Sequence, residues 1–81
     1  MKISSEPIPG VKILAPFAHE DGRGSFVKTL HQPQLQELGI QMQVREEFYS
    51  TSCRNVLRGM HFQVPPCAHQ KLVYCCRGSV L

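Results

Sequence analysis

Two apolar stretches decide the fold: VLRGMHFQ at residues 56–63 and QKLVYCC at residues 70–76. Both are rich in Val, Leu, Phe and Tyr, and β-branched and aromatic residues in particular are enriched in β-strands. The break Val64-Pro65-Pro66 separates them, and a third stretch of the same kind, QVREEFYST, fills residues 43–51. Apolar runs of this length, bounded by Pro, Asn and Gly, are typical of short strands. The C-terminal part of the sequence therefore predicts three strands.

The N-terminal part continues the strand pattern and adds one helix. Strands are predicted at Val11–Ala15 and Ser25–Leu30, and the glycine-containing stretch Ala18–Gly24 is predicted to be a loop. A short helix is predicted over Pro33–Leu38, because proline suits the first helical turn and Gly39 stands where a helix commonly ends. Several short strands at turn-marked spacing predict an all-β fold, a sandwich or barrel.

The length and the charge of the chain limit what it can be. A chain of 81 residues buries about 60–65% of the surface that its unfolded form exposes, so its core is small and a partner surface is expected. The net charge is +3, and the basic residues form no run. Nucleic-acid-binding segments cluster such charges, so nucleic acid is not an expected partner. Residues 1–81 are interpreted as a single domain, expected to be partial because Ser79-Val80-Leu81 resembles the start of another strand.

The four cysteines are Cys53, Cys67, Cys75 and Cys76, and they include no C-x-x-C pair. This spacing suits neither a disulfide framework nor a zinc ribbon, so free thiols are expected. The N-terminus lacks the apolar core of a signal peptide, and no apolar run is long enough to cross a bilayer. These features predict a reducing, cytoplasmic setting without membrane contact.

Three polar side chains with complementary chemistry lie in the two C-terminal stretches: Arg58, His61 and Lys71. If the stretches pair as a hairpin, His61 and Lys71 come within reach of each other. An imidazole, with an ordinary pKa of about 6.5, is an available base at neutral pH and can remove a proton next to a carbonyl group. An ammonium group can then stabilise the enolate oxygen. The pattern predicts proton abstraction by His61, assisted by Lys71.

The spacing of Arg58 and His61 requires an irregular strand if both are to face one pocket. They are three residues apart, so strict alternation places them on opposite faces. Gly59 lies between them, and a glycine within a strand often marks a bulge that shifts the register. The plainer interpretation makes His61 an ordinary strand histidine and Arg58 a surface side chain. From the pattern alone, the plainer interpretation is the more frequent one.

A second polar motif, Asp21-Gly22-Arg23-Gly24, carries a guanidinium on a flexible stretch. A planar guanidinium can bind a phosphate or a carboxylate through two parallel hydrogen bonds. A turn with solvated charges is the commoner origin of this composition, so both interpretations stay open.

Histidine and cysteine side chains around the Pro-Pro break raise the alternative of a metal site. His61, Cys67 and His69 fall within one predicted hairpin, but no H-x-H pair or glutamate completes the set. Catalytic zinc usually has three good protein ligands. No metal or other cofactor is therefore expected.

The motifs occur in an order that resembles a known family. They are FAHEDGRGSF at residues 17–26, NVLRGMHFQ at 55–63, the pair Pro65-Pro66 and QKLVYC at 70–75. Together they resemble the dTDP-4-dehydrorhamnose 3,5-epimerase family, from about Pro7 onward. The resemblance implies a cupin jelly roll, here a partial one, and a homodimer with exchanged strands. It also implies a metal-free isomerase reaction on a nucleoside-diphosphate 4-keto-6-deoxyhexose, in deoxysugar and polysaccharide biosynthesis.

The resemblance also assigns roles to individual residues. His61 corresponds to the family's base and Lys71 to the group that stabilises the enolate. Arg58 corresponds to a substrate and diphosphate contact, Arg23 to a diphosphate contact, and Phe26 to the nucleotide-binding region. The family's tyrosine acid and the aspartate that orients the histidine have no counterpart in these residues.

Three residues depart from the family pattern on the nucleotide side. Lys28 stands where many members have Glu, and Glu46 and Phe48 stand where they have Gln and Asn. Glu46 and Phe48 are expected to bind the substrate, but the nucleotide and the sugar stay open, and 3-epimerisation alone is an alternative to 3,5-epimerisation. Two other functions also stay open: a related 3,4-ketoisomerase, and a non-catalytic remnant that binds a sugar nucleotide or a partner chain.

Overall fold

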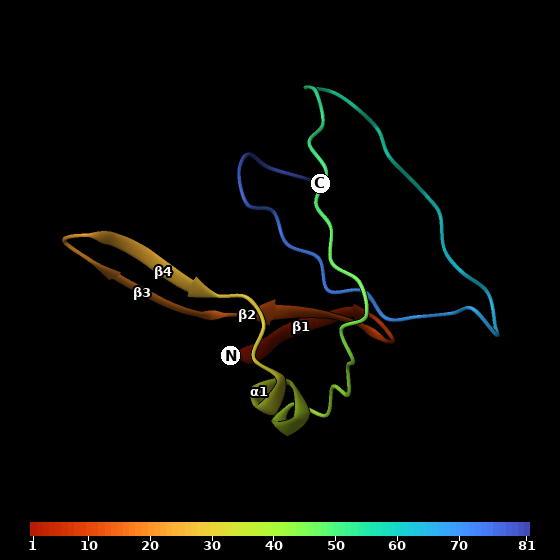
Figure 1. Ribbon diagram of the computed structural model, residues 1–81, viewed down its shortest axis with the longest axis horizontal. Coiled ribbons are helices and arrows are strands. Elements are labelled where there is room, and N and C mark those ends of the chain that lie inside the picture. Colours follow the sequence, from red (N-terminus) through yellow and green to blue (C-terminus); the bar gives the residue numbers. More distant parts are fainter. The chain divides into compact units, whose positions relative to one another are not determined.

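The computed structural model describes all residues from Met1 to Leu81 and contains four strands and one helix (Figure 1). In chain order these elements are β1 (Lys2–Ile8), β2 (Val11–Ala15), β3 (Phe17–Asp21), β4 (Gly24–Lys28) and α1 (Gln32–Glu37). β1 pairs with β2 and β3 pairs with β4, each pair forming an antiparallel two-stranded sheet. The mostly strand-forming architecture with one short helix confirms the predicted all-β class and is consistent with part of a cupin-like fold.

The β1–β2 hairpin turns at Pro9 and Gly10, the two residues between its strands. Proline at the first central position and a glycine with a φ of +87° at the second suit a type II turn. The Gly10 amide donates a hydrogen bond of 2.8 Å to Glu6 Oε1, and Lys12 Nζ lies 3.6 Å from the same oxygen. The amide hydrogen bond, followed by the charge of Lys12, lowers the pKa of the Glu6 carboxyl. Side chains from both strands therefore support this turn.

The β3–β4 hairpin is a regular ribbon with a two-residue turn at Gly22 and Arg23. Its strands pair without interruption along their whole length. Asp21 Oδ1 accepts a 2.9 Å hydrogen bond from the backbone N–H of Arg23. An aspartate that bonds to the backbone two residues ahead favours a tight reversal of the chain. The turn is therefore encoded locally, by Asp21 and the residues that follow it.

Helix α1 ends in a pair of backbone hydrogen bonds that cap its last turn. The Gly39 N–H donates to Gln36 O at 2.9 Å, and the Ile40 N–H donates to Leu35 O at 2.8 Å. With Gly39 at a φ of +78°, these bonds form a Schellman motif. The helix predicted over Pro33–Leu38 is confirmed to within one residue at each end. No helix of the chain combines the length and the apolar character that crossing a lipid bilayer requires.

The chain divides into two compact units, residues 1–42 and residues 43–81, and its small core lies in the first. Leu35 is the one fully buried side chain, with 1% of its surface exposed. The half-buried apolar residues of the first unit are Met1, Ile3, Leu14, Ala15, Leu38, Ile40 and Met42. In the second unit only Leu72 is half-buried, so its apolar side chains are almost all exposed. The prediction of a single domain stays a prediction.

The second unit lacks the strands that the sequence predicts. Residues 43–81 form neither strand nor helix, and Figure 1 draws them as a plain coil coloured from green to blue. The predictions of strands at 43–51, 56–63 and 70–76 were therefore wrong for this structure. A strand needs a partner edge for its N–H and C=O groups and a layer to cover its apolar face. Apolar composition alone supplies neither.

The predicted breaks between those stretches do occur as turns and bends. Arg54 and Asn55 form a turn in which Asn55 has a φ of 64°. The Cys67 N–H donates a 2.8 Å hydrogen bond to Val64 O across the Pro-Pro break. Gly78 lies in a bend with a φ of +84°. Turn signals act over a few residues, so they are realised even where the strands between them are not.

Two predictions for the N-terminal unit need correction. The loop predicted over Ala18–Gly24 was wrong, because Ala18 to Asp21 belong to β3 and only Gly22 and Arg23 turn. Strand β1 was not predicted, because its Ser, Glu and Pro residues have low strand propensity; it forms by pairing with β2. The strand predicted at Val11–Ala15 is confirmed as β2, and the one predicted at Ser25–Leu30 is confirmed as β4, one to two residues earlier.

Candidate functional site

One face of the β3–β4 ribbon carries aromatic, acidic and basic side chains together. Side chains alternate between the faces of a strand, so Phe17, His19 and Asp21 share a face. The register places Phe26 opposite His19 and Lys28 opposite Phe17 on that same face. The Phe17 and Phe26 ring centroids lie 6.5 Å apart with an interplanar angle of 66°, an edge-to-face arrangement. Phe26 is 56% exposed, so its ring is available to a planar ligand.

At the tip of this ribbon, Asp21 holds the side chain of Arg23. Arg23 Nη2 donates to Asp21 Oδ2 at 2.7 Å, and Arg23 Nε lies 3.2 Å from Oδ2 and 3.3 Å from Oδ1. These side-chain hydrogen bonds, followed by the one from the Arg23 backbone, lower the pKa of the Asp21 carboxyl. The same side-chain bonds raise the pKa of the Arg23 guanidinium. Both groups are therefore charged at neutral pH, and the Arg23 side chain is still 90% exposed.

An open hollow of about 270 Å³ lies beside this pair, lined by His19, Asp21, Arg23, Gly24, Ser25 and Phe26. Nε2 of His19 lies 3.7 Å from Asp21 Oδ2. A guanidinium suits a phosphate group, and an exposed aromatic ring suits a nucleobase. The structure thus brings two of the predicted site residues, Arg23 and Phe26, to one hollow.

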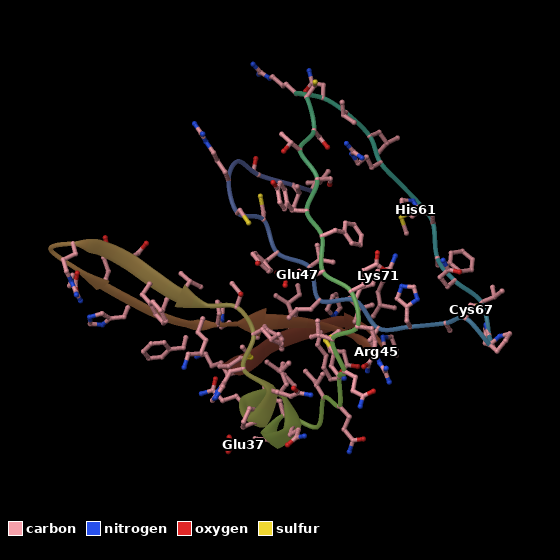
Figure 2. The ribbon with its side chains drawn as sticks, viewed as in Figure 1. Glu37, Arg45, Glu47, His61, Cys67 and Lys71 are labelled. Carbon is pink, nitrogen blue, oxygen red and sulfur yellow. The ribbon has the colours of Figure 1, made fainter.

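The predicted catalytic pair, His61 and Lys71, is not assembled in this structure. Both side chains are exposed, and neither forms a hydrogen bond or an ion pair. Figure 2 shows His61 on the outgoing limb of residues 43–81 and Lys71 on the returning limb. The hairpin between residues 56–63 and 70–76 that was to join them is absent. The chain therefore contains the histidine and the lysine of the predicted chemistry, but the structure does not place them in the predicted arrangement.

Arg58 is engaged by its neighbours along the chain. Its Nε donates to Ser52 Oγ at 2.7 Å, and its Nη2 donates to the carbonyl oxygen of Thr51 at 3.2 Å. The bulge predicted at Gly59 does not form, because residues 56–63 are not part of a sheet. Arg58 and His61 are therefore not brought to one pocket by the mechanism that the sequence predicts.

The remaining predicted binding residues are Glu46 and Phe48, and both are exposed. Glu46 forms no ion pair, and Phe48 is 81% exposed. Neither side chain has a polar partner that would fix its position for a ligand. Their assignment continues to rest on the sequence.

Histidine and cysteine side chains do not converge in this structure. No group of three or more His, Cys, Asp or Glu side chains is close enough to share a metal ion. His69 Nδ1 lies 3.2 Å from the carbonyl oxygen of Cys67. All four cysteines are unpaired and exposed.

Comparison with known sequences identifies the family. The sequence profile of the family described as dTDP-4-dehydrorhamnose 3,5-epimerase matches residues 5–81. The chain belongs to this family. The resemblance in the motifs is thereby confirmed, and the match extends through both units of the structure.

Named relatives from this epimerase family support the same assignment. The dTDP-4-dehydrorhamnose 3,5-epimerase of Salmonella typhimurium is 40% identical, that of Escherichia coli 37% and that of Shigella flexneri 36%, each over 81 residues. Each alignment covers 99% of this chain and 44% or 45% of the relative. The chain therefore spans less than half the length of these relatives. No solved structure matches the chain.

Asp21 and His19, two ionisable residues of the hollow in this member of the epimerase family, were not assigned a role from the sequence. Asp21 was noted only as part of a turn motif. Its spacing of two residues from Arg23 is the available signal, because an aspartate reaches the backbone N–H two residues ahead and can then also meet that residue's side chain. His19 carries no such signal, since its position beside Asp21 depends on both lying on one face of β3.

Proposed function

We propose that this chain takes part in the epimerisation of a nucleoside-diphosphate 4-keto-6-deoxyhexose. The observation that carries the proposal is the family match over residues 5–81, a range that includes all the proposed site residues. Relatives that align with almost the whole of this chain are named dTDP-4-dehydrorhamnose 3,5-epimerase. That name supports the proposed substrate class.

His61 is the proposed base of this reaction. Neutral imidazole removes the proton from the carbon next to the ketone, and the electron pair of the broken C–H bond moves into the carbonyl to form an enolate. The ammonium group of Lys71 donates a hydrogen bond to the enolate oxygen and stabilises its negative charge. A proton that originates from solvent adds to the opposite face of the carbon and inverts its configuration, and His61 releases the proton it took up to solvent. The cycle is redox-neutral, and its proton transfers require no cofactor.

The proposed binding residues divide by the part of the substrate they meet. Arg23 and Arg58 are cations that suit the diphosphate, and Arg is well adapted to bidentate phosphate contacts. Phe26, Glu46 and Phe48 are assigned to the nucleotide side. Support for Arg23 and Phe26 comes from the hollow that both of them line. The chemistry of Glu46 and Phe48, which replace amide side chains of the family pattern, supports a base other than thymine as an alternative.

A homodimer is the proposed working form. Its support is the small core of the chain, in which one side chain is fully buried while large apolar residues such as Ile13, Phe17 and Val27 are about half exposed. Sheets with such faces gain stability by covering them. A dimer also offers the partner edges that residues 43–81 lack.

The test is solvent-proton exchange at the sugar. The full-length protein is incubated in D2O with a dTDP-linked 4-keto-6-deoxyhexose, and with the same sugar on other nucleotides, and deuterium uptake is measured by mass spectrometry. Deuterium at one carbon indicates 3-epimerisation and at two carbons 3,5-epimerisation. Replacing His61 by Asn is expected to lower the exchange rate by about 10²–10⁴-fold, the usual contribution of a general base. His69→Asn is the matched control and should leave exchange unchanged; equal exchange in both variants contradicts the assignment of His61.

One observation favours a second function, binding without turnover. His61 and Lys71 are not brought together here, so the chain can hold a sugar nucleotide at the β3–β4 ribbon without catalysing its epimerisation. Binding of the substrate with no deuterium uptake on any nucleotide is the result expected of this function. A 3,4-ketoisomerase is separated from both by NMR of the product, because it moves the carbonyl group.

A further inference from the structure

We propose that Asp21 is a positioning residue for an anion-binding Arg23. The observation is the geometry at the tip of the β3–β4 ribbon, where the carboxylate of Asp21 contacts Nε and Nη2 of Arg23 at 2.7–3.3 Å. The proposal rests on the proposed function for its ligand, the diphosphate of a sugar nucleotide. It adds a residue that acts on the ligand only through Arg23.

The hydrogen-bond donors of Arg23 explain how one guanidinium can serve two anions. A guanidinium has five N–H groups in a rigid plane. Asp21 takes the N–H of Nε and one N–H of Nη2, on one edge of that plane. Both N–H groups of Nη1 and the second one of Nη2 are left over, and two of them point the same way along the adjacent edge. That edge matches the spacing of two phosphate oxygens.

The setting of the pair explains why positioning matters here. The Arg23 side chain is 90% exposed, so no packing restricts its several rotatable bonds. An unrestrained side chain must be ordered when it binds, and that ordering weakens binding. Asp21 is itself fixed, because its Oδ1 also accepts the 2.9 Å hydrogen bond from the Arg23 backbone. The carboxylate thus holds the guanidinium against the same turn that carries it.

The neighbouring groups are consistent with an anion at this edge. The hollow beside the pair is lined by Gly24, Ser25 and Phe26 as well as by His19. Gly24 has no atom within 4 Å of the place where a Cβ would stand, so a ligand can approach the backbone there. The imidazole of His19, on the same face as Asp21, offers a further donor. Apart from Asp21, no carboxylate lines the hollow.

A competing effect has the opposite sign. The negative charge of Asp21 repels an anion, so removing it raises the long-range attraction of the site for phosphate. Water screens that effect strongly around exposed groups, whereas the geometry of a two-bond contact depends on where the guanidinium stands. The positioning effect is therefore expected to be the larger one. Removing the charge of Asp21 should then weaken anion binding, whereas repulsion alone predicts that it strengthens binding.

The decisive experiment measures the Kd of inorganic pyrophosphate for the full-length protein and its variants by isothermal titration calorimetry. Asp21→Asn keeps an oxygen for the turn hydrogen bond but loses the charge that holds the guanidinium. We expect about a five- to tenfold higher Kd, in keeping with loss of a charge-assisted, bidentate contact. Glu20→Gln is the matched control, because Glu20 is the adjacent residue and lies on the opposite face of β3, across from Ser25. Its Kd should change by no more than about twofold.

A double-mutant cycle separates positioning from general effects on the ribbon. In an Arg23→Lys background no guanidinium fork exists, so adding Asp21→Asn should change the Kd by less than about twofold. A tighter or unchanged Kd in Asp21→Asn alone overturns the proposal. So does an equal loss in the Arg23→Lys background, because it means that Asp21 acts on the ribbon independently of the guanidinium.

A measurement on the unaltered protein covers the case in which Asp21→Asn fails to fold. The ¹⁵N NMR signal of the Arg23 Nε–H group should keep its position as pyrophosphate is added, because Asp21 keeps that donor. A large shift of the Nε–H signal means that phosphate displaces Asp21, which overturns positioning. Pyrophosphate carries no sugar, so its binding is measured independently of epimerisation. If the unaltered protein shows no deuterium uptake but Asp21→Asn still raises the Kd of pyrophosphate, only the proposed function is refuted. If deuterium is taken up but Asp21→Asn leaves that Kd unchanged, only this inference is refuted.

Discussion

Regular secondary structure and strand-like composition occur in different units of the chain. Residues 1–42 contain all four strands, the helix and the one buried side chain, yet their composition is the less strand-like of the two. Residues 43–81 contain the apolar stretches and the most specific family motif but no strand. The difference teaches that a strand is realised where its partner is close along the chain. Strand-like composition does not replace a partner.

Chain connectivity explains why the first unit succeeds. Each of its hairpins reverses through two residues, so closing the loop costs little conformational entropy. The Pro9-Gly10 turn and the Asp21 turn are both held by a hydrogen bond from a backbone N–H to a carboxylate close in sequence. In the second unit, the stretches 56–63 and 70–76 are separated by a longer segment and have no covered face.

The largest expected effect is on the core of the first unit. Replacing Leu35 by Ala removes most of the only fully buried side chain and is expected to lower the free energy of unfolding by about 2–4 kcal/mol. Urea denaturation followed by circular dichroism measures the change. Leu57→Ala is the control, because Leu57 is 94% exposed and its loss should cost less than about 0.5 kcal/mol. Similar losses in both variants contradict the contrast between the units.

A smaller effect is expected at the end of α1. Gly39 has a φ of +78°, and an alanine in that left-handed conformation costs about 1–2 kcal/mol. Gly39→Ala should therefore lower the midpoint of the same denaturation curve. Gly22→Ala is the matched control, since both glycines have open space at the Cβ position and only Gly39 has a positive φ. An unchanged midpoint in Gly39→Ala means that the Schellman motif does not form in solution.

Amide hydrogen exchange tests the comparison of the two units directly. Paired amides of the β1–β2 and β3–β4 ribbons are expected to exchange about five- to tenfold more slowly than those of residues 43–81, a modest factor because two-stranded sheets are only marginally stable. NMR resolves the individual amides. Strong protection within residues 56–63 and 70–76 at high protein concentration, and its loss on dilution, indicates that a second copy supplies the missing partner edges.

The smallest expected effect is on a titration. Hydrogen bonds from Arg23 lower the pKa of the Asp21 carboxyl, so the folded pKa lies below the unfolded one. The stabilisation from this pair is then complete above the ordinary aspartate value of about 3.9 and is lost as the pH falls through the lower folded value. Carboxyl ¹³C shifts should show the low midpoint, and Arg23→Gln should return it toward the ordinary value. The midpoint of Glu6, which pairs with Lys12, should not respond.

Particular residues show how far sequence reasoning reached. Gly39 predicted the end of α1, and Pro65-Pro66 predicted a turn, because both signals act through the conformation of one or two residues. Asp21 was missed as a partner of Arg23, because a side-chain pair at a turn depends on the turn being formed. The approach of His61 to Lys71 was predicted from a pairing that the structure does not contain.

The sequence by itself determined the family, the all-β class with its one helix and the positions of the turns within residues 43–81, since these follow from short-range conformation and from motifs along the chain. Only the tertiary structure decided which strands pair and which functional side chains meet. It joined Arg23 to Asp21 and Phe26 on one ribbon, and it left His61 and Lys71 apart. The physical reason is that distant pairing must overcome the entropy of loop closure with buried contacts, and this chain buries few.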